Sequence, residues 1–197
     1  MEGRRWHGKI AALVLASHII FTAYGFWLPN DPRGSWSEWV GSWELLKHGR
    51  ATKTSTRRSV AAQSHNAASR RAAKADLQRP AVEFNGRQAL AIARGISTAC
   101  RDSGYVVRAF AIMPDHGHII TNRHDRPAER IIGHFKSAAT RQLRTEHLHP
   151  FDDGSDRVPT VWAEGCWKRF INIGDDLMRA IDYVNDNPIK DGLPPQT

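Results

Sequence analysis

The chain has 197 residues, of which 41% are hydrophobic, so it can bury one sizeable core and its length does not require a second domain. The formal net charge is +8, which favours a polyanionic partner such as nucleic acid. The two cysteines form no CxxC pair, which argues against a zinc module and is typical of a reducing compartment, and no run approaches the roughly 20 apolar residues that cross a membrane. We therefore expect one cytoplasmic domain without a membrane partner.

The first expected element is a strand over residues 12–24. Three basic residues precede an apolar run at residues 10–16 and imitate the start of a signal peptide. His18 interrupts that run, and residues typical of strands continue it. A strand is therefore favoured over a leader, and a loop rich in turn residues follows at residues 28–34.

Residues 29–82 are expected to form a basic, tryptophan-containing insertion within the single domain of residues 1–197. A capping box that starts at Ser35 and a stop at Gly49 predict a short helix. Three tryptophans share one face of it, and they either pack against the domain or stack on unpaired bases: Trp36, Trp39 and Trp43.

Residues 50–79 hold eight basic side chains and one acidic one, and so carry +7 of the net charge. This stretch is either a poorly ordered, solvated segment or an arm that contacts DNA. The arginines expected to contact phosphate there are Arg57, Arg58, Arg70 and Arg71.

The rest of the chain predicts two helices and three strands, then a last helix. We expect a helix over residues 85–102 that stops at Gly104, strands over 105–113 and 116–122, a helix over 126–146, a strand within 161–173, and a final helix that starts at Gly174 and is ended by Pro188. The order β-α-β-β-α-β predicts a ferredoxin-like α+β sandwich, an antiparallel sheet with helices on one face, followed by a C-terminal helix that carries catalytic residues.

Two histidines, His116 and His118, stand two residues apart at the start of an apolar strand, so their side chains leave the same face and can bind one metal ion. Imidazole suits zinc, copper, iron and nickel, while oxygen ligands suit magnesium and manganese, so these residues alone leave the metal open. A His-x-His pair is a weak signal, because surface strands also place histidines on alternate positions by chance.

Tyr183 is the expected nucleophile. On the final helix, Leu177, Ile181 and Val184 form an apolar stripe, and Tyr183 lies away from it with Asn187 four residues further on. Of the three tyrosines, the other two lie in or beside predicted strands. The alternative is a tyrosine that packs under a neighbouring loop.

Three segments together resemble the single-tyrosine HUH transposases, in particular the REP-associated tyrosine transposase branch: Met113-Pro114-Asp115-His116-Gly117-His118, Gly133-His134-Phe135-Lys136-Ser137 and the run from Tyr183 to Leu193. The resemblance covers residues 105–193 and the first strand, whereas residues 29–82 look like an elaboration.

The resemblance implies a bacterial, nucleoid-associated enzyme, usually a homodimer, that cuts and rejoins single-stranded DNA near a hairpin with magnesium or manganese. His116 and His118 would be metal ligands, Tyr183 the nucleophile and Asn187 the third ligand. Lys136, Arg141 and Arg144 are candidates for phosphate contact. Two departures from the family pattern are Gly117, where a bulky apolar residue is usual and which is expected to loosen the strand, and Asn187, which reaches less far than glutamine and favours a water bridge.

Other functions are also compatible with the sequence. One is a domesticated, non-catalytic single-stranded nucleic-acid-binding protein of the same fold. Ferredoxin-like RNA-binding modules need exposed aromatics on their central strands, and residues 106–113 offer only Phe110. Replication-initiation and relaxase nucleases carry a similar histidine pair, but with extra domains.

Overall fold

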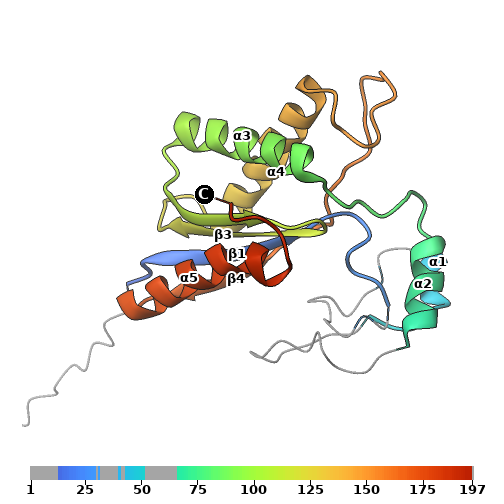
Figure 1. The fold of residues 1–197 in the computed structure, drawn as a ribbon, viewed down its shortest axis with the longest axis horizontal. Coiled ribbons are helices and arrows are strands. Elements are labelled where there is room, and N and C mark those ends of the chain that lie inside the picture. Colours follow the sequence, from blue (N-terminus) through green and yellow to red (C-terminus); the bar gives the residue numbers. More distant parts are fainter. Residues whose placement is uncertain (1–12, 30, 32–39, 41–42, 52–65, 197) are drawn as a thin grey trace, which may run out of the picture.

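The sheet is antiparallel and has four strands. The computed structural model describes residues 13–29, 31, 40, 43–51 and 66–196. Its strands are β1 (Ala16–Thr22), β2 (Val107–Ile112), β3 (His116–Asn122) and β4 (Trp167–Ile171), arranged in the order β2-β3-β1-β4. The helix that directly precedes β2 and the helix between β3 and β4 lie on the same face of this sheet, which is the predicted ferredoxin-like arrangement (Figure 1).

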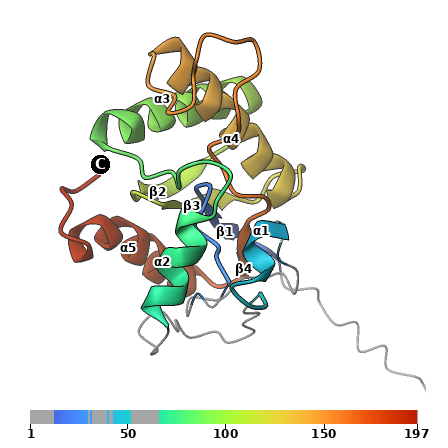
Figure 2. The ribbon, with the colours of Figure 1, turned by 90° about the vertical axis from the view of Figure 1, so that its right-hand side faces the viewer.

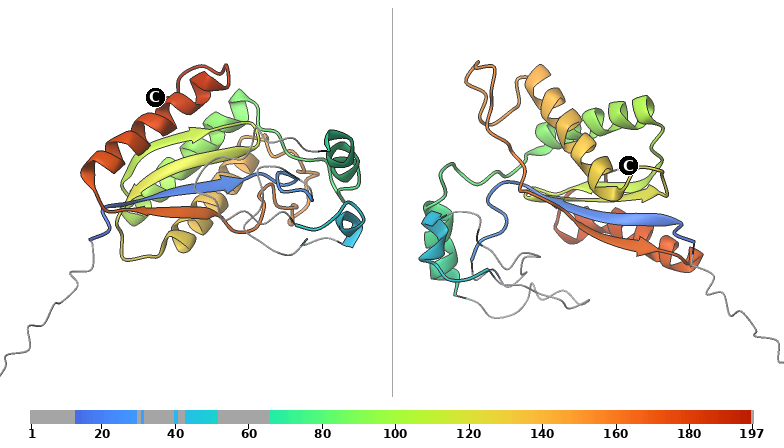
Figure 3. Two further views of the ribbon diagram at one scale, coloured as in Figure 1. Left: turned by 90° about the horizontal axis from the view of Figure 1, so that it is seen from below. Right: turned by 180° about the vertical axis from the view of Figure 1, so that it is seen from behind.

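Helices cover both faces of the sheet. α3 (Gly86–Ser103) and α4 (Ala128–Thr145) pack against each other on one face, and α5 (Gly174–Lys190) lies on the other, as the right-hand view of Figure 3 shows. Strand alternation therefore separates two cores. Ile19, Phe21 and Ile119 belong to the core under α3 and α4, whereas Ile120 and Val184 belong to the core under α5.

The helix that precedes β2 ends where its sequence signals predicted. Asn85 caps α3: its side chain accepts from the backbone N–H of Gln88 at 3.0 Å, and the Gln88 side chain accepts from the backbone N–H of Asn85 at 2.9 Å. Gly104 ends the helix in the left-handed conformation, with φ of 69°. These local signals confirm the predicted bounds of this helix.

The predicted end of the final helix is wrong. Pro188 lies inside α5, which continues to Lys190. In the last turn a proline removes only one hydrogen bond, and Pro188 is buried. The helix ends instead in a Schellman motif, in which Gly192 has φ of 73° and the N–H groups of Gly192 and Leu193 donate to Ile189 and Pro188.

The first strand is shorter than predicted, and the last lies where it was predicted. β1 covers seven residues of the predicted 12–24, and β4 covers five residues within 161–173. Before β4, the chain touches the sheet at a single bridge between Ala23 and Trp162. The hydrophobic residues around Trp162 therefore make a core contact from a loop, which an apolar run cannot distinguish from a strand.

The described part of the insertion forms a small helical unit beside the sandwich. α1 (Trp43–Leu46) and α2 (Ala67–Ala75) lie side by side, and Leu45 and Ala73 meet in a separate apolar cluster with Leu28 (Figure 2). Trp43 is 87% exposed, so the first of the two alternatives for the tryptophan face, packing against the domain, does not hold for this residue. The N-terminal basic residues, Ser35, Trp36, Trp39, Arg57 and Arg58 lie outside the described residues.

Phe21 fills the space left by the glycine between the two histidines. Phe21 pairs with Gly117 across β1 and β3, and a Cβ on Gly117 would lie 2.5 Å from the Phe21 ring carbon Cζ. The ring is 2% exposed and makes an edge contact with Trp162 at 5.6 Å between centroids. A cross-strand aromatic ring therefore covers the glycine and fills the space at this position, while the loosening of β3 itself stays a prediction.

We predict that Gly117→Ala lowers the free energy of unfolding by about 1–3 kcal/mol, the usual cost of overpacking a filled core. Adding Phe21→Leu should restore part of this loss. Gly133→Ala is the matched control, because nothing lies within 4 Å of the position that its methyl group would take and a helix favours alanine. Urea denaturation measures all three, and an unchanged midpoint for Gly117→Ala would contradict the packing argument.

Candidate active site

The two histidines of β3 point at each other on the face of the sheet that α5 covers. Their Nε2 atoms lie 3.1 Å apart, and their ring centroids are 5.0 Å apart. Gly117 stands between them on the opposite face. The strand alternation therefore brings the two imidazoles together as predicted.

Each of these histidines has a partner for its other ring nitrogen. His116 Nδ1 lies 2.7 Å from a carboxylate oxygen of Asp115, and His118 Nδ1 lies 3.1 Å from Nε2 of His18 on β1. The Asp115 carboxylate can only accept, so it holds the proton of His116 on Nδ1 and leaves the His116 Nε2 free to bind a metal. Between His18 and His118, either ring nitrogen can be the donor.

The site keeps the buried histidines neutral. Burial, aided by the nearby charge of Arg169, lowers the pKa of His18 from 6.5 to about 4. Burial, followed by the charges of His116 and His18, lowers the pKa of His118 to about 2. Neutral imidazole is the form that binds metal ions.

Tyr183 of α5 lies over the same group. Its ring centroid is 5.6 Å from that of His118 and 6.1 Å from that of His18, and the residue is 45% exposed. The apolar stripe predicted for this helix is confirmed, with Val184 buried and Leu177 and Ile181 packed on the same core. The structure therefore brings the predicted nucleophile and the histidine pair together within one chain.

The surroundings of Tyr183 hold its hydroxyl in the protonated form. Burial, followed by the charge of Asp191, raises the pKa of the phenol above its ordinary value. Lys190 Nζ lies 5.5 Å from the ring centroid, on the exposed side of the helix. A neutral phenol is a weak nucleophile, so this site needs either a proton acceptor or a more electrophilic phosphorus atom.

The donor set fits a metal ion only if oxygen ligands complete it. Two nitrogens bound to one ion at about 2.0–2.1 Å lie about 2.9–3.4 Å apart, and the Nε2 separation of 3.1 Å falls in this range. Among the described residues, no three His, Cys, Asp or Glu side chains form a complete metal site. Asn187, half-buried one helical turn beyond Tyr183, makes no described hydrogen bond to either histidine, so its ligand role stays a prediction.

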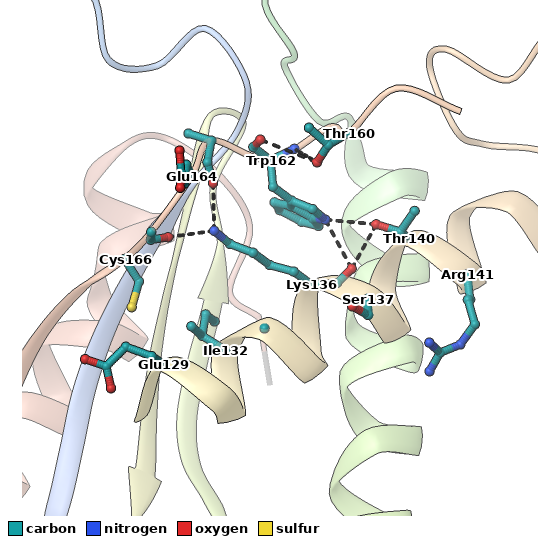
Figure 4. Close-up of a pocket in the computed structure, with 13 residues that line it drawn as sticks. Glu129, Ile132, Lys136, Ser137, Thr140, Arg141, Thr160, Trp162, Glu164 and Cys166 are labelled. Atoms are coloured by element: carbon teal, nitrogen blue, oxygen red, sulfur yellow. Dashed lines mark hydrogen bonds between the residues drawn. The ribbon is translucent and has the colours of Figure 1, made fainter. Parts of the chain in front are cut away.

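Lys136, one of the predicted phosphate contacts, lies in an open pocket of about 670 Å³ between α4 and the segment before β4. Its Nζ donates to the carbonyl oxygens of Ala163 at 2.8 Å and Gly165 at 2.7 Å, as Figure 4 shows. Burial lowers its pKa, while Cys166 and Glu164 act in the opposite direction. Lys136 therefore holds this segment against α4, and any phosphate contact would use its remaining N–H donor.

The other basic candidates differ in how free they are. Arg144 donates to the carbonyl oxygens of Ser155 and Asp156 and so holds a loop, and Arg70 lies 3.3 Å from Asp31. Arg141 and Arg71 are exposed and have no hydrogen bond or ion pair within the described part of the chain. Among the predicted phosphate contacts that the structure describes, these two arginines are the most open to a phosphate.

The known proteins to which this chain is similar belong to the class that the sequence predicted, the REP-associated tyrosine transposases. No family model matches the chain. A Haemophilus influenzae protein named "Putative REP-associated tyrosine transposase" is 31% identical over 98 residues, which cover 47% of this chain and 54% of that protein. The chain thus spans about half the length of this curated relative. The predicted resemblance to the REP-associated tyrosine transposases is confirmed.

A solved structure shows the same fold. A REP-associated tyrosine transposase, solved bound to a REP hairpin, matches 98% of this chain and 76% of its own, with a TM-score of 0.50 and 14% identity. At this identity the likeness concerns the fold alone.

Within the described residues, none of the helices is both long enough and apolar enough to span a bilayer.

Sequence reasoning missed two residues of the site, His18 and Asp115. Asp115 could have been found, because it directly precedes the histidine pair in a turn, where its side chain can reach a neighbouring ring. His18 is 100 residues from His118, and its only sequence signal is a histidine within an apolar strand. That pattern is as common in satisfied core histidines as in functional ones.

We predict that the metal-free protein loses stability as the pH falls from about 6.5 towards 4. In this range the unfolded chain binds protons at His18 that the folded chain excludes, so the free energy of unfolding should fall by at most roughly 3 kcal/mol from this residue. Urea denaturation in chelator at several pH values measures the slope. His18→Gln, whose amide does not titrate, should have a shallower slope, and equal slopes would contradict the assignment.

We predict that Lys136→Met destabilises the protein by about 1–3 kcal/mol, because two carbonyl oxygens lose a charged donor. Arg141→Met on the same helix is the matched control and should leave thermal unfolding unchanged, because Arg141 has no hydrogen bond or ion pair within the described residues. Thermal melts measure both variants. Equal stability of Lys136→Met and wild type would show that these hydrogen bonds do not hold the segment.

Proposed function

We propose that this protein is a DNA transposase that cleaves and rejoins single-stranded DNA near hairpins through Tyr183. The observation that carries the proposal is the approach of the Tyr183 ring to within 5.6 Å of the His118 ring in one chain. The related transposase named above supports the class, and the hairpin bound to the structural neighbour supports the kind of DNA. The homodimer implied by the resemblance is part of the proposal, although one chain already holds these site residues.

In the proposed reaction, the Tyr183 oxygen attacks the phosphorus atom, an O–P bond to tyrosine forms and the bond to the 3′ oxygen breaks. The phenol loses its proton to solvent or a nearby base, and the departing oxygen gains one to give a 3′-hydroxyl. The resulting 5′-phosphotyrosine conserves the energy of the phosphodiester, so a 3′-hydroxyl of another end can reverse the step without ATP.

His116 and His118 would hold magnesium or manganese, with Asn187 and DNA oxygens as further ligands. The ion would polarise a non-bridging phosphate oxygen, which compensates for a phenol that stays protonated at neutral pH. Asp115 and His18 would orient the two imidazoles; the sheet carries the three histidines, and Asp115 lies in the turn directly before β3. The pocket and the free arginines, Arg71 and Arg141, would position the DNA backbone.

We predict that wild-type protein, incubated with labelled single-stranded hairpin DNA and Mn²⁺, forms a covalent adduct visible on a denaturing gel. Tyr183→Phe should form none and still bind the hairpin, because only the hydroxyl is removed. Tyr24→Phe is the matched control and should form the adduct normally, since Tyr24 packs beside Phe151 in the other core.

Two outcomes would contradict the proposal. An adduct with Tyr183→Phe would show that another residue is the nucleophile. Hairpin binding by wild-type protein without any adduct would favour the non-catalytic binding protein. Nothing in the described part of the structure favours that alternative specifically, because Phe21 restores the packing that Gly117 lacks.

A further inference from the structure

His18 occupies an enclosed position behind the histidine pair. It is 7% exposed on β1, diagonal to His118 across the β1–β3 pairing, in which Ile20 stands opposite His118. Trp167 makes an edge contact with the His18 ring at 5.6 Å between centroids, and Tyr183 covers another side at 6.1 Å. These rings fix the orientation of the imidazole, so its nitrogens cannot turn freely.

The short contacts along the three imidazoles allow two arrangements of protons. In the first, His18 Nε2–H donates to His118 Nδ1, and His118 Nε2–H donates to His116 Nε2 at 3.1 Å. In the second, His118 Nδ1–H donates to His18 Nε2, and both facing Nε2 atoms carry only lone pairs. Asp115 holds the proton of His116 on Nδ1 in both arrangements.

Only the second arrangement can bind a cation. Two bare lone pairs 3.1 Å apart repel each other unless a positive ion lies between them. The first arrangement places a proton where the ion would bind. Binding therefore requires His118 to carry its proton on Nδ1, and a buried N–H of that kind needs an acceptor.

We propose that His18 is a positioning residue for the metal site: its Nε2 accepts the Nδ1–H of His118 and so holds His118 in the tautomer that binds a divalent cation. This role rests on the proposed function. Through His18, strand β1 would supply a hydrogen-bond acceptor for His118 that neither the histidine motif of β3 nor Tyr183 of α5 provides.

Two substitutions of nearly equal shape separate hydrogen bonding from packing. His18→Gln places an amide oxygen near the position of Nε2 and can still accept from His118, whereas His18→Met fills the same space without an acceptor. We expect His18→Met to weaken Mn²⁺ binding about 10- to 100-fold, the usual effect of removing such a partner, and His18→Gln to stay within a few-fold of wild type. Mn²⁺ binding is followed by electron paramagnetic resonance on the full chain without DNA.

Thermal melts and hairpin binding in chelator report the fold of each variant. Unchanged Mn²⁺ binding by His18→Met would overturn the proposal, and so would an equal loss in both variants. A wild-type protein that binds no Mn²⁺ would instead contradict the metal-dependent function on which the inference rests, and the two failures are therefore distinguishable.

The position of the proton on His18 is a second quantity to measure, and a residue that served only to fill space would not need one particular position. Nitrogen-15 NMR of the imidazoles in the Mg²⁺-loaded protein should show His18 protonated on Nδ1 with Nε2 bare, as an acceptor requires. Protonation of His18 at Nε2 in the loaded protein would overturn the proposal, because that nitrogen would then donate to His118 and leave no proton on its Nδ1.

Discussion

The site depends on the antiparallel pairing of β1 with β3. This register places Phe21 on Gly117 on one face of the sheet and brings His18 beside His118 on the other. Because the side-chain period of a strand is two residues, a slip of β1 by one position would move His18 into the apolar core under α3 and α4 and Phe21 into the site. Packing and chemistry are therefore set by the same backbone hydrogen bonds.

The second requirement is the placement of α5. This helix packs over β2, where Ala109 and Ala111 are buried small residues, and its own Val184 is fully buried against them. The Schellman motif at Gly192 returns the chain so that Leu193 joins the same core. Tyr183 is thus carried on an element anchored along its length, and its ring overlies the histidines without a separate loop.

Local patterns predicted most of the fold because their causes are local. The Asn85 cap, the Gly104 stop and the alternation of β3 are set within a few residues, and the structure confirms them. The exposure of Trp43, the carbonyl partners of Lys136 and the contact of His18 with His118 depend on segments far apart in the chain. The periodicity of a sequence carries no information on such distant pairs. Pro188 is a local signal for the end of a helix, yet it is buried within the last turn of α5 and the helix continues past it.

The contact between Phe21 and Gly117 ties two positions in the sequence to each other. Because the Phe21 ring occupies the space that a Cβ at position 117 would need, a change at one of these two positions requires a change at the other. Relatives with a bulky apolar residue between their histidines should carry a smaller residue at the facing position of the first strand. The residue between the two histidines and the residue that faces it on β1 should therefore vary together among relatives.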